Sequence, residues 1–365
     1  PARCSTVGTR VEGWLRFRSC AGWLLVVVAS VGVWFAVIHT SIAKDVLTEL
    51  RHLCAAVGGL IRLALATNLL EIAITVSAAV QHKLDIAIGN ILGGIALQTV
   101  VLVVLDVFGV GGRKALSYVG SSLQLVLEAG LVIAVLVVVV MGTQFPASAT
   151  HFRLEPAALL IMALWIGGLW LLGRARNGLP WHEQGDPPDG QDAPRGIRKK
   201  KREQQADPST ARAVIVFAVS ALVTLIGGVL LERSGERIAG HIGMTGVLFG
   251  ATVLAAATSL PEVSTGIASV KMGDYQLAFS DIFGGNAFLP VLFLVASLLS
   301  GSAVLPQAQN TDIYLTALGG LLTAVYIYGL IFRPTRLVAR MGLDSLVVLI
   351  LYVVGIVGLV FVSQS

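Results

Sequence analysis

The stretch GATVLAAATSLPEVST, residues 250–265, decides the fold because a second version of it, GLIRLALATNLLEIAI, lies at residues 59–74. At this offset of 191 positions, residues 59–100 align with residues 250–291 without a gap, and 13 of the 42 pairs are identical. The identical pairs include Thr67 with Thr258, Glu71 with Glu262, Gly93 with Gly284 and Gly94 with Gly285. Apolar segments resemble one another through composition alone, whereas matched hydroxyl, carboxyl and glycine positions in one register indicate an internal repeat.

The composition is that of an integral membrane protein. Of the 365 residues, 55% are hydrophobic and 13% are charged, with a mean hydropathy of +0.82, whereas soluble domains carry about 25% charged residues. The alternating pattern of a membrane barrel is absent. Apolar runs near the roughly 20 residues that span a bilayer recur along the chain. We therefore expect an all-α membrane protein of ten transmembrane helices, at about residues 22–40, 55–80, 84–106, 118–141, 156–173, 211–231, 243–270, 275–300, 312–332 and 343–362.

A polar stretch divides the ten predicted helices into two sets of five. Residues 174–210 are rich in Pro, Gly and charge and predict a solvated linker. An N-terminal extension at 1–21 and a first five-helix repeat at 22–173 precede it, and a second repeat at 211–365 follows it. Because five is an odd number, the second repeat enters the membrane in the opposite orientation. Inverted repeats are typical of secondary transporters, whose site lies near the membrane midplane.

The first apolar run has an alternative interpretation as a secretory signal peptide. Basic residues precede it, and Ser41-Ile42-Ala43 resembles a cleavage site. However, residues 22–40 align with residues 213–231 of the sixth helix at the same offset. A cleaved segment would have no reason to match, so we favour a transmembrane helix.

The distribution of Lys and Arg predicts the orientation. With the amino terminus outside, the inner loops hold 16 basic residues and the outer side holds 8. Inner loops of membrane proteins carry the excess of Lys and Arg. We therefore expect a cell-membrane protein with both termini outside and the linker in the cytoplasm.

Other classes of function find little support. The three cysteines, Cys4, Cys20 and Cys54, have no spacing that suggests a disulfide framework or a zinc site. The pI near 9.3 reflects basic loops, so no nucleic-acid partner is inferred. A zinc-enzyme motif and a nucleotide-binding loop are both absent, which argues against an enzyme, a bound cofactor and an ATP-driven pump. The expected partners are inorganic cations and the lipid bilayer, and the oligomeric state stays open.

Pro261 and Glu262 stand where a continuous membrane helix is expected. Proline removes a backbone donor and disrupts the preceding turn, which frees carbonyls that can ligate a cation. Glu262 supplies negative charge, and Thr258 and Ser259 lie one turn before it. This set of hard oxygen ligands suits calcium or sodium.

Glu71, Thr67 and Asn68 form the inverted counterpart of this set. The alternative is that Glu71 and Glu262 are paired or protonated structural carboxylates. Ionisable residues at membrane depth are costly and usually mark ion pathways, and two of them related by the repeat favour a functional role.

The helices after the two glutamates carry further candidates. Asn90 aligns with Asp281, and each begins an x-x-Gly-Gly motif whose glycines allow close helix packing. Asp281 is an acid on an apolar helix and is predicted to be a ligand, with Asn286 and Gln98 as weaker candidates. Glu128 aligns with Gly319, so it has no acidic counterpart and stays outside the predicted core site.

These motifs resemble the calcium/cation antiporter superfamily, which includes the sodium/calcium exchangers. ATSLPE at 257–262 is similar to its Gly-Thr-Ser-x-Pro-Glu motif, and SDIFGGN at 280–286 is similar to its Gly-Asn-x-x-Gly-Ser-Asn segment. ATNLLE at 66–71 and GNILGGI at 89–95 are degenerate first copies. The resemblance implies that Glu71 and Glu262 bind the exchanged ions during alternating access, with support from Thr67, Thr258 and Ser259.

The chain departs from the family pattern at several ligands. The family's Gly-Ser-Asn is Gly93-Gly94-Ile95 in the first copy, and the second copy loses its Ser at Gly285. Three residues beyond each motif, where exchangers carry Asn or Asp, this chain has Gln98 and Leu289. Asp281 lies eight residues before Leu289, about 12 Å along a helix, so it cannot replace that ligand.

The sequence therefore predicts a secondary cation antiporter that exports calcium or a related cation in exchange for protons or sodium. The reduced ligand set favours protons over several sodium ions. Two alternatives stay open. One is a transporter or channel for another cation such as potassium or magnesium. The other is a non-transporting membrane scaffold or sensor of the same fold.

Overall fold

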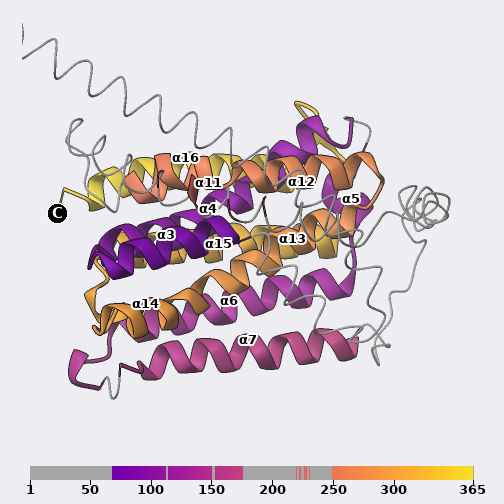
Figure 1. Ribbon diagram of the computed structural model, residues 1–365. Coiled ribbons are helices and arrows are strands. Elements are labelled where there is room, and N and C mark those ends of the chain that lie inside the picture. The colour runs from indigo at the N-terminus through magenta and orange to yellow at the C-terminus, as the bar shows by residue number, and fades with distance from the viewer. Residues whose placement is uncertain are drawn as a thin grey trace, which may run out of the picture.

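The computed structural model describes residues 68–111, 114–149, 153–175 and 249–364, together with five single positions between 219 and 230. The predicted N-terminal extension, the first helix, most of the sixth and the linker from residue 176 onward lie outside the described residues, and the helix Pro156–Ala175 extends two residues into the predicted linker. Helices make up nearly all of the described chain (Figure 1). In chain order the elements are α3 (Leu69–Val80), α4 (Leu84–Phe108), α5 (Leu116–Gly120), α6 (Leu123–Thr143), η1 (Ala147–Ala149), α7 (Pro156–Ala175), η2 (Gly250–Leu254), α11 (Ala255–Thr258), α12 (Leu260–Lys271), α13 (Tyr275–Phe288), η3 (Leu289–Val291), α14 (Leu292–Ser300), η4 (Leu305–Gln307), α15 (Asn310–Phe332), β1 (Leu337–Val338), β2 (Met341–Gly342) and α16 (Leu343–Val362).

Several helices are long and apolar enough to cross a membrane. Within the described ranges there are six such spans, or seven if the bent pair Gly250–Thr258 and Leu260–Lys271 is one span. The six are Leu84–Phe108, Leu123–Thr143, Pro156–Ala175, Tyr275–Ser300, Asn310–Phe332 and Leu343–Val362. Each matches a predicted run to within a few residues, and α3 covers the carboxyl-terminal part of the predicted 55–80 run. The multi-pass helical character is confirmed, and the total of ten stays a prediction.

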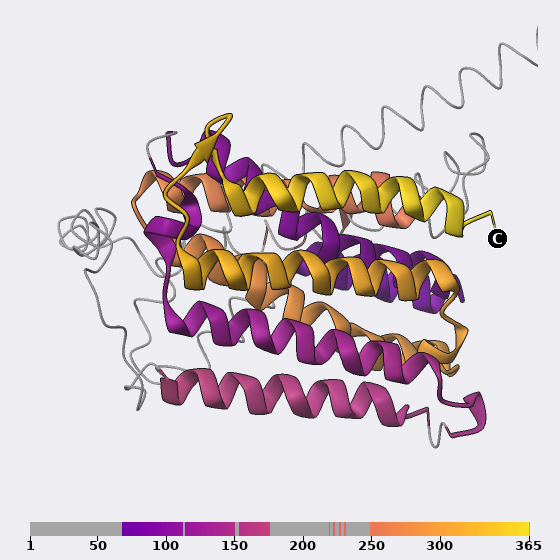
Figure 2. The same cartoon turned by 180° about the vertical axis from the view of Figure 1, so that it is seen from behind.

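The helices pack into a bundle with a buried centre. Seen from behind, α16, α15, α6 and α7 lie side by side in that order (Figure 2). Helix α4 and the α13–α14 span are the most buried, whereas α16 is the least buried. Exposed apolar side chains on α16, such as Val354 and Phe361, are 62% and 70% accessible. An apolar face of this kind suits contact with lipid.

Two of the predicted transmembrane helices are interrupted, one next to Pro261 and the other at Ser122. The span at 250–271 bends by 44° between Thr258 and Leu260, and Pro261 lies in the first turn of α12. This confirms the predicted disruption before the proline. The predicted 118–141 run is instead divided, because the Ser122 hydroxyl caps α6 by accepting the N–H of Leu125 at 3.3 Å.

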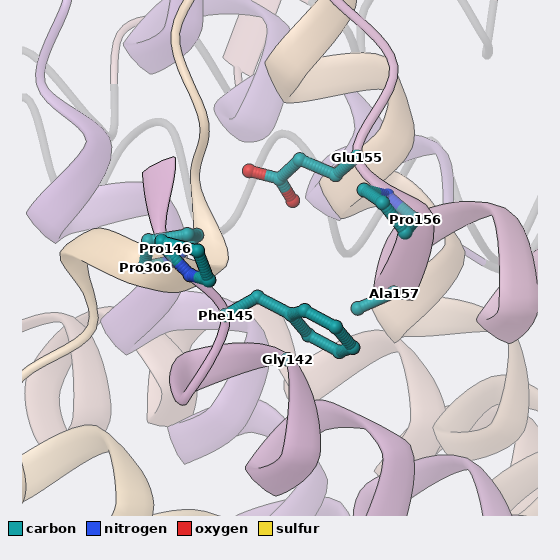
Figure 3. A pocket seen from close by; sticks show the side chains of 7 residues that line it. All are labelled: Gly142, Phe145, Pro146, Glu155, Pro156, Ala157 and Pro306. Carbon is teal, nitrogen blue, oxygen red and sulfur yellow. The ribbon is translucent and has the colours of Figure 1, made fainter. Parts of the chain in front are cut away.

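The loops at one end of the bundle are held by Glu155. This side chain is 2% exposed, and Oε1 accepts the backbone N–H of Val304. A small pocket beside it is lined by Gly142, Phe145, Pro146, Glu155, Pro156, Ala157 and Pro306 (Figure 3). None of these residues belongs to the predicted cation site.

Candidate cation site

Glu71 lies in the first turn of α3, where its side chain is 1% exposed. Gln98 on α4 donates a hydrogen bond from Nε2 to Glu71 Oε1 at 3.4 Å. Glu71 Oε2 has no hydrogen-bond partner among the described residues. One carboxylate oxygen is therefore oriented by Gln98, while the other is available to a ligand.

Asn68 lies directly before α3 and is also buried, with 1% exposure. A methyl group on Gly285 would lie 3.4 Å from both side-chain polar atoms of Asn68 and 3.6 Å from Gln98 Oε1. The absence of a side chain at Gly285 thus leaves room for polar groups from α3 and α4 at the surface of α13. Thr67, the remaining candidate of this segment, lies outside the described residues.

The helix break between α11 and α12 carries the second set of candidates. Glu262, 3% exposed, lies in the first turn of α12. The hydroxyls of Thr258 and Ser259 donate to the backbone oxygen of Ala255 at 3.1 and 2.8 Å. Both hydroxyl hydrogens therefore form hydrogen bonds within the helix. The lone pairs of the two hydroxyl oxygens are the groups that could bind a cation.

Asp281 on α13 is tied to α12 by Thr265. The Thr265 hydroxyl lies 2.9 Å from Asp281 Oδ2, and also 3.1 and 3.3 Å from the backbone oxygens of Pro261 and Glu262. Asp281 is thus joined to α12, the helix that carries Glu262.

The amide candidates Asn90 and Asn286 are both fully buried. Neither polar atom of the Asn90 side chain has a hydrogen-bond partner in the described part of the chain. Asn286 Nδ2 donates to Ile95 O at 3.3 Å and to Thr99 Oγ1 at 3.2 Å. Its Oδ1 has no partner among the described residues, so both asparagines keep an oxygen that could face a cation.

The glycine pairs do not all serve close packing. A methyl on Gly93 would lie 2.2 Å from Ala251 Cα, so α4 and η2 need glycine there. The aligned residue, Gly284, has no described atom within 4 Å of the corresponding methyl position. The packing interpretation therefore holds for the first copy of the motif and finds no support at Gly284.

Sequence reasoning missed three polar residues beside the site. Thr265 holds Asp281, Thr99 accepts from Asn286, and Ser280 donates to Glu128 Oε2 at 2.7 Å. Thr265 could have been found, because it lies three residues after Glu262 on the same helical face. Thr99 and Ser280 give no such signal, since their partners come from other helices.

The candidate residues offer oxygen ligands from several helices, and such ligands can bind a cation that has lost its water shell. The described residues contain no group of three or more His, Cys, Asp or Glu placed to hold a metal ion. The candidates instead combine single carboxylates with amide and hydroxyl oxygens from α3, α4, α12 and α13. Oxygen sets of this type suit hard cations.

Comparisons with known proteins identify the family of the chain. The model of the family described as "Sodium/calcium exchanger protein" matches residues 21–173 and 212–361. The putative antiporter CaxA of Alkalimonas amylolytica is 27% identical over 258 residues, which cover 70% of this chain and 74% of that protein.

Two solved structures share the fold. The structure of native YfkE aligns with a TM-score of 0.60 and 15% identity, over 97% of both chains. The sodium-calcium exchanger NCX_Mj aligns with a TM-score of 0.55 and 16% identity, over 93% of this chain and 99% of that one. The match of the family model to both halves shows that this chain belongs to the sodium/calcium exchanger protein family and, with its several apolar helices, is a multi-pass membrane cation antiporter.

Proposed function

We propose that the chain exports calcium or a related cation in exchange for protons by alternating access, with sodium as the alternative counter-ion. The observation that carries this proposal is the burial of Glu71 and Glu262, at 1% and 3% exposure, in the first turns of α3 and α12. Buried carboxylates in a membrane bundle are costly unless they bind an ion or a proton. The ten-member ligand set proposed here is Thr67, Asn68, Glu71, Asn90, Gln98, Thr258, Ser259, Glu262, Asp281 and Asn286.

The preference for protons over sodium as the counter-ion rests on Leu289. It is fully buried at the position that aligns with Gln98, so the second repeat offers no polar side chain there. Binding several sodium ions needs many oxygen ligands, whereas a carboxylate binds a proton alone. The exchange of one calcium ion for protons on Glu71, Glu262 and Asp281 is compatible with this reduced set.

We propose further that the two halves are inverted five-helix repeats. The packing of α4 against α13 and the following η3 supports this. A methyl on Gly94 would lie 3.8 Å from Leu289 Cδ1, and a methyl on Gly285 would lie 3.6 Å from Gln98 Oε1. In the alignment of the two halves, Gly94 pairs with Gly285 and Gln98 pairs with Leu289. Exchanging each residue of the first pair of neighbours for its aligned residue therefore gives the second pair. A two-fold axis between the repeats produces such reciprocity.

The domain boundaries and orientation belong to the same proposal. The repeats cover residues 22–173 and 211–365, and the linker at 174–210 lies in the cytoplasm with both termini outside. The excess of basic residues on the inner side supports this orientation. Cysteine accessibility on either side of the membrane would test it.

Gradient-driven uptake tests the proposed exchange. Radioactive calcium is offered to proteoliposomes with an imposed proton gradient and, separately, an imposed sodium gradient. We expect the proton gradient to drive uptake. Uptake driven only by the sodium gradient would show that sodium, and not the proton, is the counter-ion. If the folded protein takes up no calcium under either gradient, calcium is not the transported ion.

A further inference from the structure

Asp106 and Asp344 form a second buried acid pair, at the end of the bundle where α5 and the β hairpin lie (Figure 1). They occupy the last turn of α4 and the first turn of α16, with 0% and 6% exposure. A methyl on Gly342 would lie 2.5 Å from Asp344 Oδ1 and 3.4 Å from Asp106 Oδ2. The two carboxylates therefore flank the same backbone position.

The backbone favours the charged form of both acids. Asp106 Oδ1 accepts the N–H of Leu116 and Oδ2 accepts the N–H of Gly342, each at 2.7 Å. Such bonds strengthen when the acceptor is ionised. Asp344 lies in the first turn of α16, where a helix favours negative charge. Two like charges close together in a buried site repel each other, and a cation bound between them removes this repulsion.

The structure leaves oxygen atoms available for that cation. Neither oxygen of Asp344 has a hydrogen-bond partner among the described residues. The Ser117 hydroxyl, 1% exposed, faces Asp344, and its oxygen makes no hydrogen bond to any described residue. Gly329 makes room for the carboxylate, because a methyl there would lie 2.3 Å from Asp344 Oδ2.

We propose that Asp106, Asp344 and Ser117 bind a divalent cation of the calcium class at a site separate from the proposed transport site. A divalent ion neutralises both carboxylates, whereas a monovalent ion leaves one charge buried. Calcium accepts six to eight oxygen ligands with flexible geometry, so water can complete the shell. The bound ion joins the end of α4 to the start of α16. Because α4 also carries Gln98, the ion stabilises the helix that orients Glu71.

The test uses the full chain in detergent with the proposed transport site disabled by Glu71→Gln and Glu262→Gln. Thermal unfolding is followed as calcium chloride is added, with choline chloride at equal ionic strength as the salt control. The melting temperature is expected to rise with calcium in this double variant. Adding Asp344→Asn is expected to abolish the rise, whereas adding Asp85→Asn, an exposed acid on α4, leaves it intact.

Ser117→Ala gives a second variant that keeps both carboxylates. Added to the double variant, it is expected to raise the calcium concentration at half effect roughly tenfold. The proposal is overturned if the double variant shows no calcium response, or if the response survives Asp344→Asn unchanged. Because the transport-site glutamates are already removed, either result is independent of whether the chain transports calcium.

Discussion

Asn286 on α13 donates a hydrogen bond to the backbone oxygen of Ile95 on α4 at 3.3 Å, and these two residues are 191 positions apart. The same offset aligns the two halves of the sequence. Residues that the alignment pairs therefore touch each other where the two central helices cross. Thr99 extends the contact by accepting from Asn286 at 3.2 Å. This crossing holds together the helices that carry Gln98 and Asp281.

The two glycines Gly93 and Gly284 provide a matched pair of substitutions. Gly93→Ala places a methyl 2.2 Å from Ala251 Cα, so α4 and η2 must separate. Overpacking of this kind destabilises by about 1–3 kcal/mol. We expect a lower melting temperature and reduced transport, measured by thermal unfolding and calcium uptake. Gly284→Ala, at the aligned position, meets no described atom within 4 Å and should keep both properties. Equal losses in the two variants would contradict this packing.

Sequence reasoning reached the membrane class, the helix break and the approximate spans because these depend on local composition. Pro261 breaks its own helix, and apolar runs of span length are read directly from the sequence. The hydrogen bond between Thr265 and Asp281 shows the opposite case, although each residue can be singled out from the sequence. The bond joins α12 to α13, and the orientation of each helix about its axis decides which hydroxyl meets the acid. Likewise, Gly93 and Gly284 are identical in the alignment and differ only in their neighbours.

Gln98 is predicted to set the affinity for the transported cation through Glu71. Gln98→Leu copies the aligned Leu289 and removes the hydrogen bond that Gln98 donates to Glu71. We expect the calcium concentration for half-maximal uptake to rise roughly tenfold. Gln124→Leu is the matched control, since Gln124 also donates to a buried glutamate, Glu128, at 3.0 Å. Similar increases in both variants would show that the effect is not specific to Glu71.

Thr265 is predicted to position Asp281 for cation binding. Thr265→Val removes the hydroxyl that lies 2.9 Å from Asp281 Oδ2 while keeping the branched shape. Uptake measured against calcium concentration should show an affinity roughly tenfold weaker or more, because a charge-assisted hydrogen bond contributes about 1.5–3 kcal/mol. Thr265→Ser restores the hydroxyl and should restore most of the affinity. Failure of serine to rescue would assign the effect to packing.

Glu155 is predicted to make stability depend on pH. Burial raises the pKa of its carboxyl above the ordinary value of 4.5, although the amides of Val304 and Leu305 act in the opposite direction. A raised pKa means that the folded state binds the proton more tightly than the unfolded state. This contribution to stability is fully present below pH 4.5 and is lost as pH rises through the folded-state pKa.

Thermal unfolding of the wild type and Glu155→Gln, measured from below pH 4.5 upward, gives the contribution of Glu155 to the stability of the protein. The melting temperature of the wild type should fall relative to the variant as pH rises above about 4.5. Parallel curves for the two proteins would show that Glu155 does not titrate differently on folding.

The central claim is that Glu71 and Glu262 bind the transported cation, and calcium uptake by Glu262→Gln tests it most directly. Wild type, Glu262→Gln and the buried control Glu155→Gln are compared in proteoliposomes under a proton gradient at equal protein content. Glutamine keeps the size of the side chain and removes its charge. We predict that Glu262→Gln loses uptake while Glu155→Gln retains it. Uptake by folded Glu262→Gln at the wild-type rate would contradict the assignment of the site.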